Sequence, residues 1–326
     1  MDEQQYYRIS GLENGRRIES RILEERIQQA VADGVRNIEV EAYGHHGIGG
    51  RLWFTGGESV RVDVHGHPGQ RIGAMGSPFT TIEVYGPASD DVGWLNAGAT
   101  IIVHGDATNG VANAMAQGKI YVAGNIGARG MTMTKHNPRF DPPELWVLGG
   151  TGDSFAEFMA GGIAVVCGVE TLCRSGLILG NRPCVGMVGG RIFFRGHQKT
   201  FSEADAKLVR ISDEEWSWLK AGLNEFLAAV DRGYLYEELA SDRSAWQLIT
   251  ARHPSEKARR PRRSMAGFRR EVWDEELGKG GLIGDLTDID RSPVGVITTG
   301  ELRRFVPVWN NESRVSPCQA SCPTGI

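Results

Sequence analysis

The residues best suited to chemistry stand near residue 320, where the sequence reads SPCQASCPTGI. Cys318 and Cys322 form a Cys-x3-Cys-Pro arrangement, in which two thiolates could bind one iron–sulfur cluster. A [4Fe–4S] cluster takes four thiolate ligands, so the other ligands would have to come from elsewhere. We therefore predict a partial [4Fe–4S] ligand set at Cys318 and Cys322.

Other polar arrangements invite a catalytic interpretation but have simpler explanations. Asp153 and Ser154 could belong to a triad, yet no motif ties a histidine to them, and a turn is favoured. The segment GNIGARG (124–130) lacks the Lys-Ser/Thr ending and following helix of a phosphate loop, which favours turn glycines. His65 and His104 occupy the same repeat position two coils apart, which predicts a stacked surface column and no shared ion.

The remaining cysteines are expected to be small core residues. Cys167, Cys173 and Cys184 carry no ligand spacing, and buried cysteine commonly packs as a hydrophobe. No catalytic residue and no residue that binds an organic cofactor is predicted in this chain.

A repeat organises the middle of the chain. The pattern apolar-x-Val-x-Gly appears as VDVHG (62–66), IEVYG (82–86), IIVHG (101–105), IYVAG (120–124) and LWVLG (145–149). IAVVCG (163–168) is aligned as a further copy with one residue added, and VGMVGG (185–190) as a plausible last copy. We expect one buried column of the central valines, which are Val64, Val84, Val103, Val122, Val147 and Val165.

The spacing of these valines predicts a parallel β-helix. Successive valines are 20, 19, 19, 25 and 18 residues apart, which suits coils that stack strand on strand. The 44 glycines are concentrated where such coils must turn. The long interval holds MTMTKHNPRFDPP (131–143), expected as an outward loop. A doubly wound nucleotide-binding fold would need longer helices between the strands.

Helices are expected on both flanks of the repeat, covering its ends or sides. Residues 18–33 have helical apolar spacing, and a strand follows in RNIEVEAYG. Residues 211–233 form a second helix, with Ser212 and Glu215 as a capping box. Residues 252–270 carry eight Lys or Arg against one Glu and predict a solvated linker.

The totals exclude several classes of protein. The net charge of −4 over 326 residues disfavours nucleic acid as a partner. No signal peptide and no membrane-length apolar run is visible, so a cytoplasmic location is expected. Five cysteines, an odd number, do not indicate a disulfide framework.

Three blocks of the repeat resemble a known family. GQRIGAM (69–75), TTIEVYGPASDDVGWLNAGATIIVHG (80–105) and GDSFAEFMAGGIAVVCG (152–168) are similar to the GXGXG domain of the glutamate synthase large subunit. The C-type subunit of formylmethanofuran dehydrogenase is similar to the same domain. The resemblance implies a right-handed parallel β-helix without catalytic residues of its own, which positions neighbouring catalytic domains.

The segment RVSPCQASCPTGI (314–326) resembles the opening of the small glutamate synthase subunit, which carries FAD and iron–sulfur clusters. This resemblance implies that the chain is the front of a longer polypeptide or a subunit whose tail docks beside a partner's cluster. FAD or FMN and NAD(P)H are then expected only in partner subunits or domains. The amidotransferase and FMN-binding domains are missing, so this chain alone should not make glutamate.

Together these inferences predict a mainly β protein with flanking helices and an extended C-terminal tail. The expected parts are a helix–strand cap (1–44), the β-helix (45–200), a helical cap (201–250), a basic linker (251–313) and the start of an iron–sulfur segment (314–326). Two functions remain open. One is a non-catalytic scaffold in a glutamate synthase-like iron–sulfur flavoprotein, with the FAD/iron–sulfur subunit and other oxidoreductase subunits as partners. The other is a component like the C-type subunit of formylmethanofuran dehydrogenase, beside a metal-dependent catalytic subunit.

Overall fold

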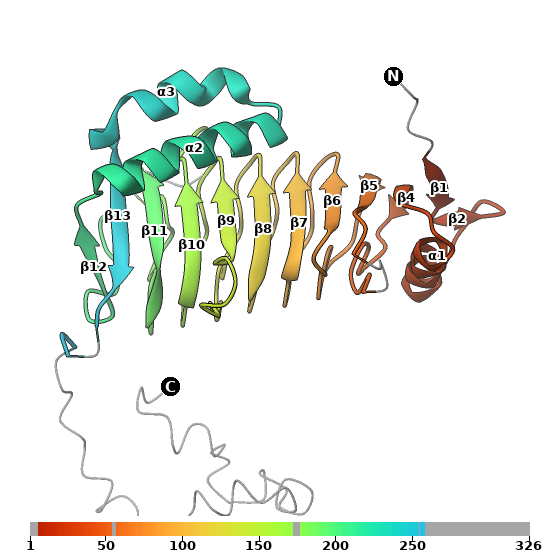
Figure 1. Ribbon diagram of the computed structural model, residues 1–326, viewed down its shortest axis with the longest axis horizontal. Coiled ribbons are helices and arrows are strands. Elements are labelled where there is room, and N and C mark those ends of the chain that lie inside the picture. Colours follow the sequence, from red (N-terminus) through yellow and green to blue (C-terminus); the bar gives the residue numbers. More distant parts are fainter. Residues whose placement is uncertain (1–5, 54–56, 172–176, 254, 258–326) are drawn as a thin grey trace, which may run out of the picture. The chain divides into compact units, whose positions relative to one another are not determined.

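The fold is that of a computed structural model, which describes residues 6–53, 57–171, 177–253 and 255–257. Strands dominate these residues, and helices are few (Figure 1). The strands are β1 (Tyr7–Ser10), β2 (Leu12–Glu13), β3 (Arg16–Arg17), β4 (Asn37–Tyr43), β5 (Val60–His67), β6 (Thr80–Val84), β7 (Ala97–Val103), β8 (Gln117–Val122), β9 (Glu144–Val147), β10 (Ala160–Val166), β11 (Gly189–Arg195), β12 (Ala206–Val209) and β13 (Trp246–Ala251). The helices are α1 (Ser20–Ala32), α2 (Asp213–Ala229) and α3 (Tyr236–Ser241), with short 3-10 turns η1 (Gly233–Leu235) and η2 (Arg243–Ala245). The expectation of a mainly β protein is confirmed.

One large mixed sheet contains all of these strands except the β2–β3 hairpin. Its order is β1-β4-β5-β6-β7-β8-β9-β10-β11-β13-β12. From β1 to β11 each strand pairs in parallel with its neighbour, whereas β13 and β12 add antiparallel strands at the end. The two antiparallel strands fall in a region expected to be only helical. The right-handed winding implied by the family resemblance stays a prediction.

A column of buried side chains runs through the sheet, with one correction to the predicted alignment. Val64, Val84, Val103, Val122 and Val147 are paired in register and buried. The next member is Val166, which pairs with Val147, whereas the predicted Val165 pairs with Trp146 and faces the other side of the sheet. The sequence alignment inserted a residue before Gly168 that the backbone does not need, and correct register restores a spacing of 19.

The predicted last copy at 185–190 is also wrong as a strand. Residues 183–188 form the turn that precedes β11, and the strand itself supplies Phe194 as the partner of Val166. A short Val-Gly pattern fits a turn of this fold as well as a strand, because the turns also bury one side chain in each coil.

Tight turns connect the strands, and the turns stack on one another as the strands do. Backbone N–H groups of one turn donate to carbonyls of the next, for example Asp91 N to Asn109 O at 2.7 Å. Asp and Asn side chains reinforce this stacking, since Asp90 Oδ1 accepts from Asn109 N at 2.9 Å. Gly93 has a φ of +67°, and a Cβ there would lie only 2.2 Å from Ile120 Cδ1.

No helix lies between β5 and β11 among the described residues, which argues against the doubly wound alternative. Residues 135–141 are exposed and lack regular structure, so the predicted outward loop is confirmed.

The two long helices cover different parts of the sheet, as predicted. Helix α1 adds Leu23 and Ile27 to the interior apolar cluster shared by strands and turns. Helix α2 begins at the predicted capping box, in which Ser212 Oγ accepts from Glu215 N and Glu215 accepts from Ser212 N. It packs with α3 on the outer face of the sheet, in a second apolar cluster (Figure 1).

Candidate functional site

The outward-facing side chains of the sheet change character along the stack. At the central outward position β5 and β6 carry Asp63 and Glu83, whereas β8, β9 and β11 carry Tyr121, Trp146 and Phe193. The apolar side chains belong to the cluster that α2 and α3 cover. The acidic side chains lie before the helices begin, so a polar network takes the place of a helical cover there.

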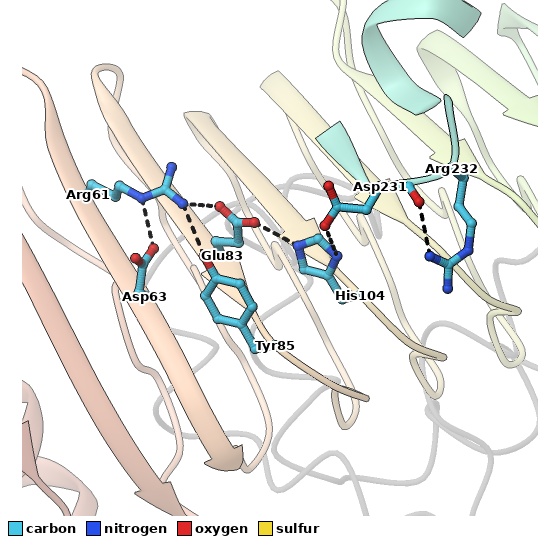
Figure 2. A network of polar contacts seen from close by, with 7 residues as sticks. All are labelled: Arg61, Asp63, Glu83, Tyr85, His104, Asp231 and Arg232. Atoms are coloured by element: carbon cyan, nitrogen blue, oxygen red, sulfur yellow. Dashed lines mark hydrogen bonds and ion pairs between the residues drawn. The ribbon is translucent and has the colours of Figure 1, made fainter. Parts of the chain in front are cut away.

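Arg61 on β5 is the centre of this polar network (Figure 2). Its Nε lies 2.9 Å from Asp63 Oδ1 as an ion pair, although the N–H direction misses this oxygen and no hydrogen bond forms. Its Nη2 donates to Glu83 on β6 and, at 3.3 Å, to the hydroxyl of Tyr85. One guanidinium thus joins two neighbouring strands.

His104 extends the network from β6 to the end of α2. Its Nε2 lies 2.6 Å from Glu83 Oε1, and its Nδ1 lies 3.8 Å from Asp231 Oδ2. Asp231 follows α2 and has a φ of +57°, a left-handed conformation that Asp tolerates. His104 therefore connects the uncovered part of the sheet with the helix that covers the rest (Figure 2).

Three aromatic rings form a column beside these charges, as the sequence predicted for the two histidines. The rings of His65 and Tyr85 are stacked with centroids 4.6 Å apart, and those of Tyr85 and His104 are 5.3 Å apart. Tyr85 thus fills the space between the histidines. No group of three or more His, Cys, Asp or Glu side chains that could hold a metal ion occurs among the described residues.

The electrostatics of the network favour fixed charges. Burial opposes the charge on Arg61, but Asp63, Tyr85 and Glu83 outweigh it and raise the pKa of Arg61. Burial also raises the pKa of Tyr85, and the nearby carboxylates of Asp63 and Glu83 add to the rise. Both groups therefore keep their protons at neutral pH, so the guanidinium carries its charge and the phenol is neutral. The network acts as a clamp between strands.

A second polar cluster fastens α2 to the sheet. Lys119 Nζ donates to both carboxylate oxygens of Glu225 at 2.8 and 2.9 Å, and Tyr121 Oη donates to Glu225 at 2.8 Å. Burial opposes ionisation of Glu225, but these donors outweigh it and lower its pKa. Nearby, burial raises the pKa of Glu144, which accepts from Trp146 Nε1 at 2.8 Å.

The candidates taken from the sequence occupy structural positions. Asp153 Oδ1 accepts from the backbone N and the Nδ2 of Asn181 at 2.8 and 2.9 Å, which makes it a link between stacked turns. Ser154 sits in that turn with a φ of +59°. In GNIGARG, a Cβ on Gly127 would lie 2.6 Å from Asn109 Oδ1, so this glycine permits close stacking.

The two cysteines that the structure describes are unreactive by environment. Cys167 and Cys184 are buried. Burial raises the pKa of the Cys167 thiol and raises that of Cys184 to about 12. Cys173, Cys318 and Cys322 lie outside the described residues, so the partial cluster site stays a prediction.

Sequence reasoning missed the Arg61 network although a signal was present. The residue before the central valine is Asp63 in VDVHG and Glu83 in IEVYG but Ile102 in IIVHG. A carboxylate at a position that is otherwise apolar needs a cation, and Arg61 lies two residues from Asp63. Asp231 could not have been found in this way, because only the tertiary fold brings it to His104.

Fold and site together define a class of protein, a repetitive mainly β module whose described polar clusters join its own strands and helices. The chain belongs to the GXGXG motif family, whose family model matches residues 22–240; this is the type of domain found in the large subunit of glutamate synthase.

A curated relative is similar over part of its length. The uncharacterized protein MJ1350 of Methanocaldococcus jannaschii is 27% identical over 168 residues, which are 45% of this chain and 64% of that protein. The chain thus spans less than two thirds of the relative's length. Among the described residues, no helix has the length and apolar character needed to cross a membrane.

Proposed function

We propose that this chain is a non-catalytic scaffold in a glutamate synthase-like iron–sulfur flavoprotein, and that its repeat winds as a right-handed parallel β-helix. The observation that carries the proposal is the fate of the polar residues. Asp153, His104 and the Arg61 network all link one coil, strand or helix to the next. The family match supports the proposal, because GXGXG domains occur in glutamate synthase-like proteins.

In this proposal flavin and NAD(P)H bind to partner subunits or domains of the same assembly. Cys318 and Cys322 supply two thiolates to a [4Fe–4S] cluster, and the partner supplies the others. A scaffold of stacked coils suits this task because its position and spacing do not depend on ligand binding.

Two measurements test the proposal. The purified full chain should show no glutaminase, glutamate synthase or NAD(P)H oxidase turnover, because its described polar clusters are engaged in structural contacts. An affinity-tagged chain expressed in its own cell should co-purify with a flavin- and iron-containing partner. Turnover by the chain alone would overturn the scaffold role.

The cluster is tested in the same preparation. Iron and sulfide content of the assembly should fall in Cys318→Ser and Cys322→Ser but not in the neighbouring control Ser321→Ala. Full cluster content in both cysteine variants would show that these residues are not ligands, without affecting the scaffold role.

A further inference from the structure

One exposed face of the molecule is apolar without a described cover. It follows the turns that connect the strands, where a single side chain of each coil points to solvent. These side chains, which we call the turn ridge, are Met75, Leu95, Ala114, Met133 and Phe158. All five residues have a φ between +54° and +56°. Leu95, Met133 and Phe158 are 38%, 49% and 46% exposed, although an apolar side chain is not needed at a solvent-facing turn.

The ridge is continuous because the turns are hydrogen-bonded in sequence. Met75 N donates to Trp94 O at 2.8 Å, and Leu95 N donates to Asn113 O at 3.0 Å. Ala114 N donates to Thr132 O at 2.8 Å, and Met133 N donates to Glu157 O at 3.0 Å. Each ridge residue therefore directly precedes its successor in the stack. With strands about 4.8 Å apart, the ridge is about 19 Å long.

The two ends of the ridge differ in shape. Beside Met75 lies an open hollow of about 540 Å³, lined by Trp53, Phe79, Leu95 and other residues. The opposite end carries the half-exposed ring of Phe158. The small side chain of Ala114 lies midway, two coils from each end. One copy of the face thus has a hollow where the reversed face has a ring.

A row of charges runs beside the ridge, four residues earlier in each turn. The row reads Arg71, Asp91, Gly110, Arg129 and Ser154, and Asp153 precedes Ser154. Its coils are the same ones that carry the ridge. Arg71 lies 5.1 Å above the ring of Trp94, which places this row against the apolar face. Within the row, Arg71 and Asp91 form a long ion pair of 3.8 Å.

The signs of these charges are antisymmetric about the central coil. Going out from Gly110, one direction meets Asp91 and then Arg71, and the other meets Arg129 and then Asp153. A two-fold axis through the central coil, lying in the face and across the coils, reverses their order in the partner. Asp91 then faces Arg129 of a second copy, and Arg71 faces Asp153.

We propose that the turn ridge is the interface of a symmetric dimer of this chain, with the two copies antiparallel about the coil that contains Gly110 and Ala114. The same axis sets the ring of Phe158 over the hollow beside Met75, and Leu95 against Met133. Ala114 meets its own copy, where its small side chain allows close approach. Such an interface is isologous, the commonest symmetry of soluble oligomers. An axis along the stack would place the charged row against the ridge, which is unfavourable.

Sedimentation of the full chain under reducing conditions tests this proposal. The wild type should associate to a dimer as concentration rises through the micromolar range. Arg129→Asp and Asp91→Arg each bring like charges together twice per dimer and should weaken association about tenfold or more. The double variant restores opposite charges and should recover most of the lost affinity.

The apolar part has its own variant and control. Phe158→Asp should abolish the dimer, and Asp is well tolerated at a positive φ. Tyr234→Asp, at a residue 77% exposed on η1, should leave the dimer intact. Circular dichroism of each variant should match the wild type. A monomer at every concentration, a dimer indifferent to Phe158→Asp and Arg129→Asp, or a double variant as weak as the single ones would overturn the proposal.

Discussion

Glu83 shows how single residues replace a missing layer of structure. It is buried, with only 9% of its surface exposed, and its carboxylate contacts both Arg61 and His104. A buried carboxylate is stable only when its charge is compensated, and here the compensation comes from the strands on either side. The clamp therefore holds three strands together where no helix covers them.

The substitution Glu83→Gln tests this clamp. It should destabilise the chain by about 3 kcal/mol, because Arg61 keeps its buried charge and loses one of its two carboxylate partners. Urea unfolding followed by circular dichroism measures the change. Glu39→Gln is the matched control, since Glu39 pairs with Arg8 in an ion pair with an 80% exposed guanidinium, and should cost less than about 1 kcal/mol. Equal effects of the two substitutions would contradict the clamp.

Helix α2 is the element that divides the outer face of the sheet. It shields Trp146 and Phe193, and it is held at three places: its capping box, the Lys119–Glu225 contact and the His104–Asp231 contact near its end. Since these contacts lie along the whole helix, α2 should exchange its amide hydrogens slowly over its length.

The substitution Ser212→Ala should remove the side-chain half of the capping box. We expect a loss of about 1 kcal/mol in the free energy of unfolding and faster hydrogen exchange in the first turn of α2. Ser217→Ala is the control, because Ser217 bonds only to Asp213 O within the exposed helix and should change little. An effect of Ser217→Ala as large as that of Ser212→Ala would argue against a special role for the cap.

At the scale of the whole molecule, the stack from β4 to β11 is nearly one-dimensional, because each coil contacts mainly its two neighbours. Stability then depends on an unbroken interior column, and a defect in the middle affects coils on both sides. The outer surfaces are specialised in turn, with the clamp and α2 on the sheet and the apolar ridge on the turns.

Val122→Asp tests the interior column. Val122 is fully buried between Val103 and Val147, so an aspartate there is a buried charge without a partner. We expect a loss of roughly 4 kcal/mol or more and a large fall in Tm, or no soluble protein. Val188→Asp, at a residue 62% exposed, should leave Tm within a few degrees of the wild type. An unchanged Tm in Val122→Asp would show that the column is not the core.

Much of this fold could be predicted from local patterns. The valine spacing indicated stacked parallel strands, the glycine-rich segments indicated turns, and Ser212 with Glu215 marked the start of α2. Each of these signals depends on residues close in sequence, because strand period, turn conformation and capping are local properties. The pairing of His65 and His104 in one surface column followed from the repeat period alone.

Tertiary structure decided whatever depends on register and on distant neighbours. The exchange of Val165 for Val166 in the interior column is a shift of one residue, which sends a side chain to the opposite face, and both residues are valine. The antiparallel strands β12 and β13 find their partner only at the open end of the stack. Asp231 reaches His104 across more than a hundred residues of chain, and no local pattern records where a helix will end on a sheet. The antisymmetric charges became visible only when hydrogen bonds between turns placed Arg71, Asp91, Arg129 and Asp153 in one row.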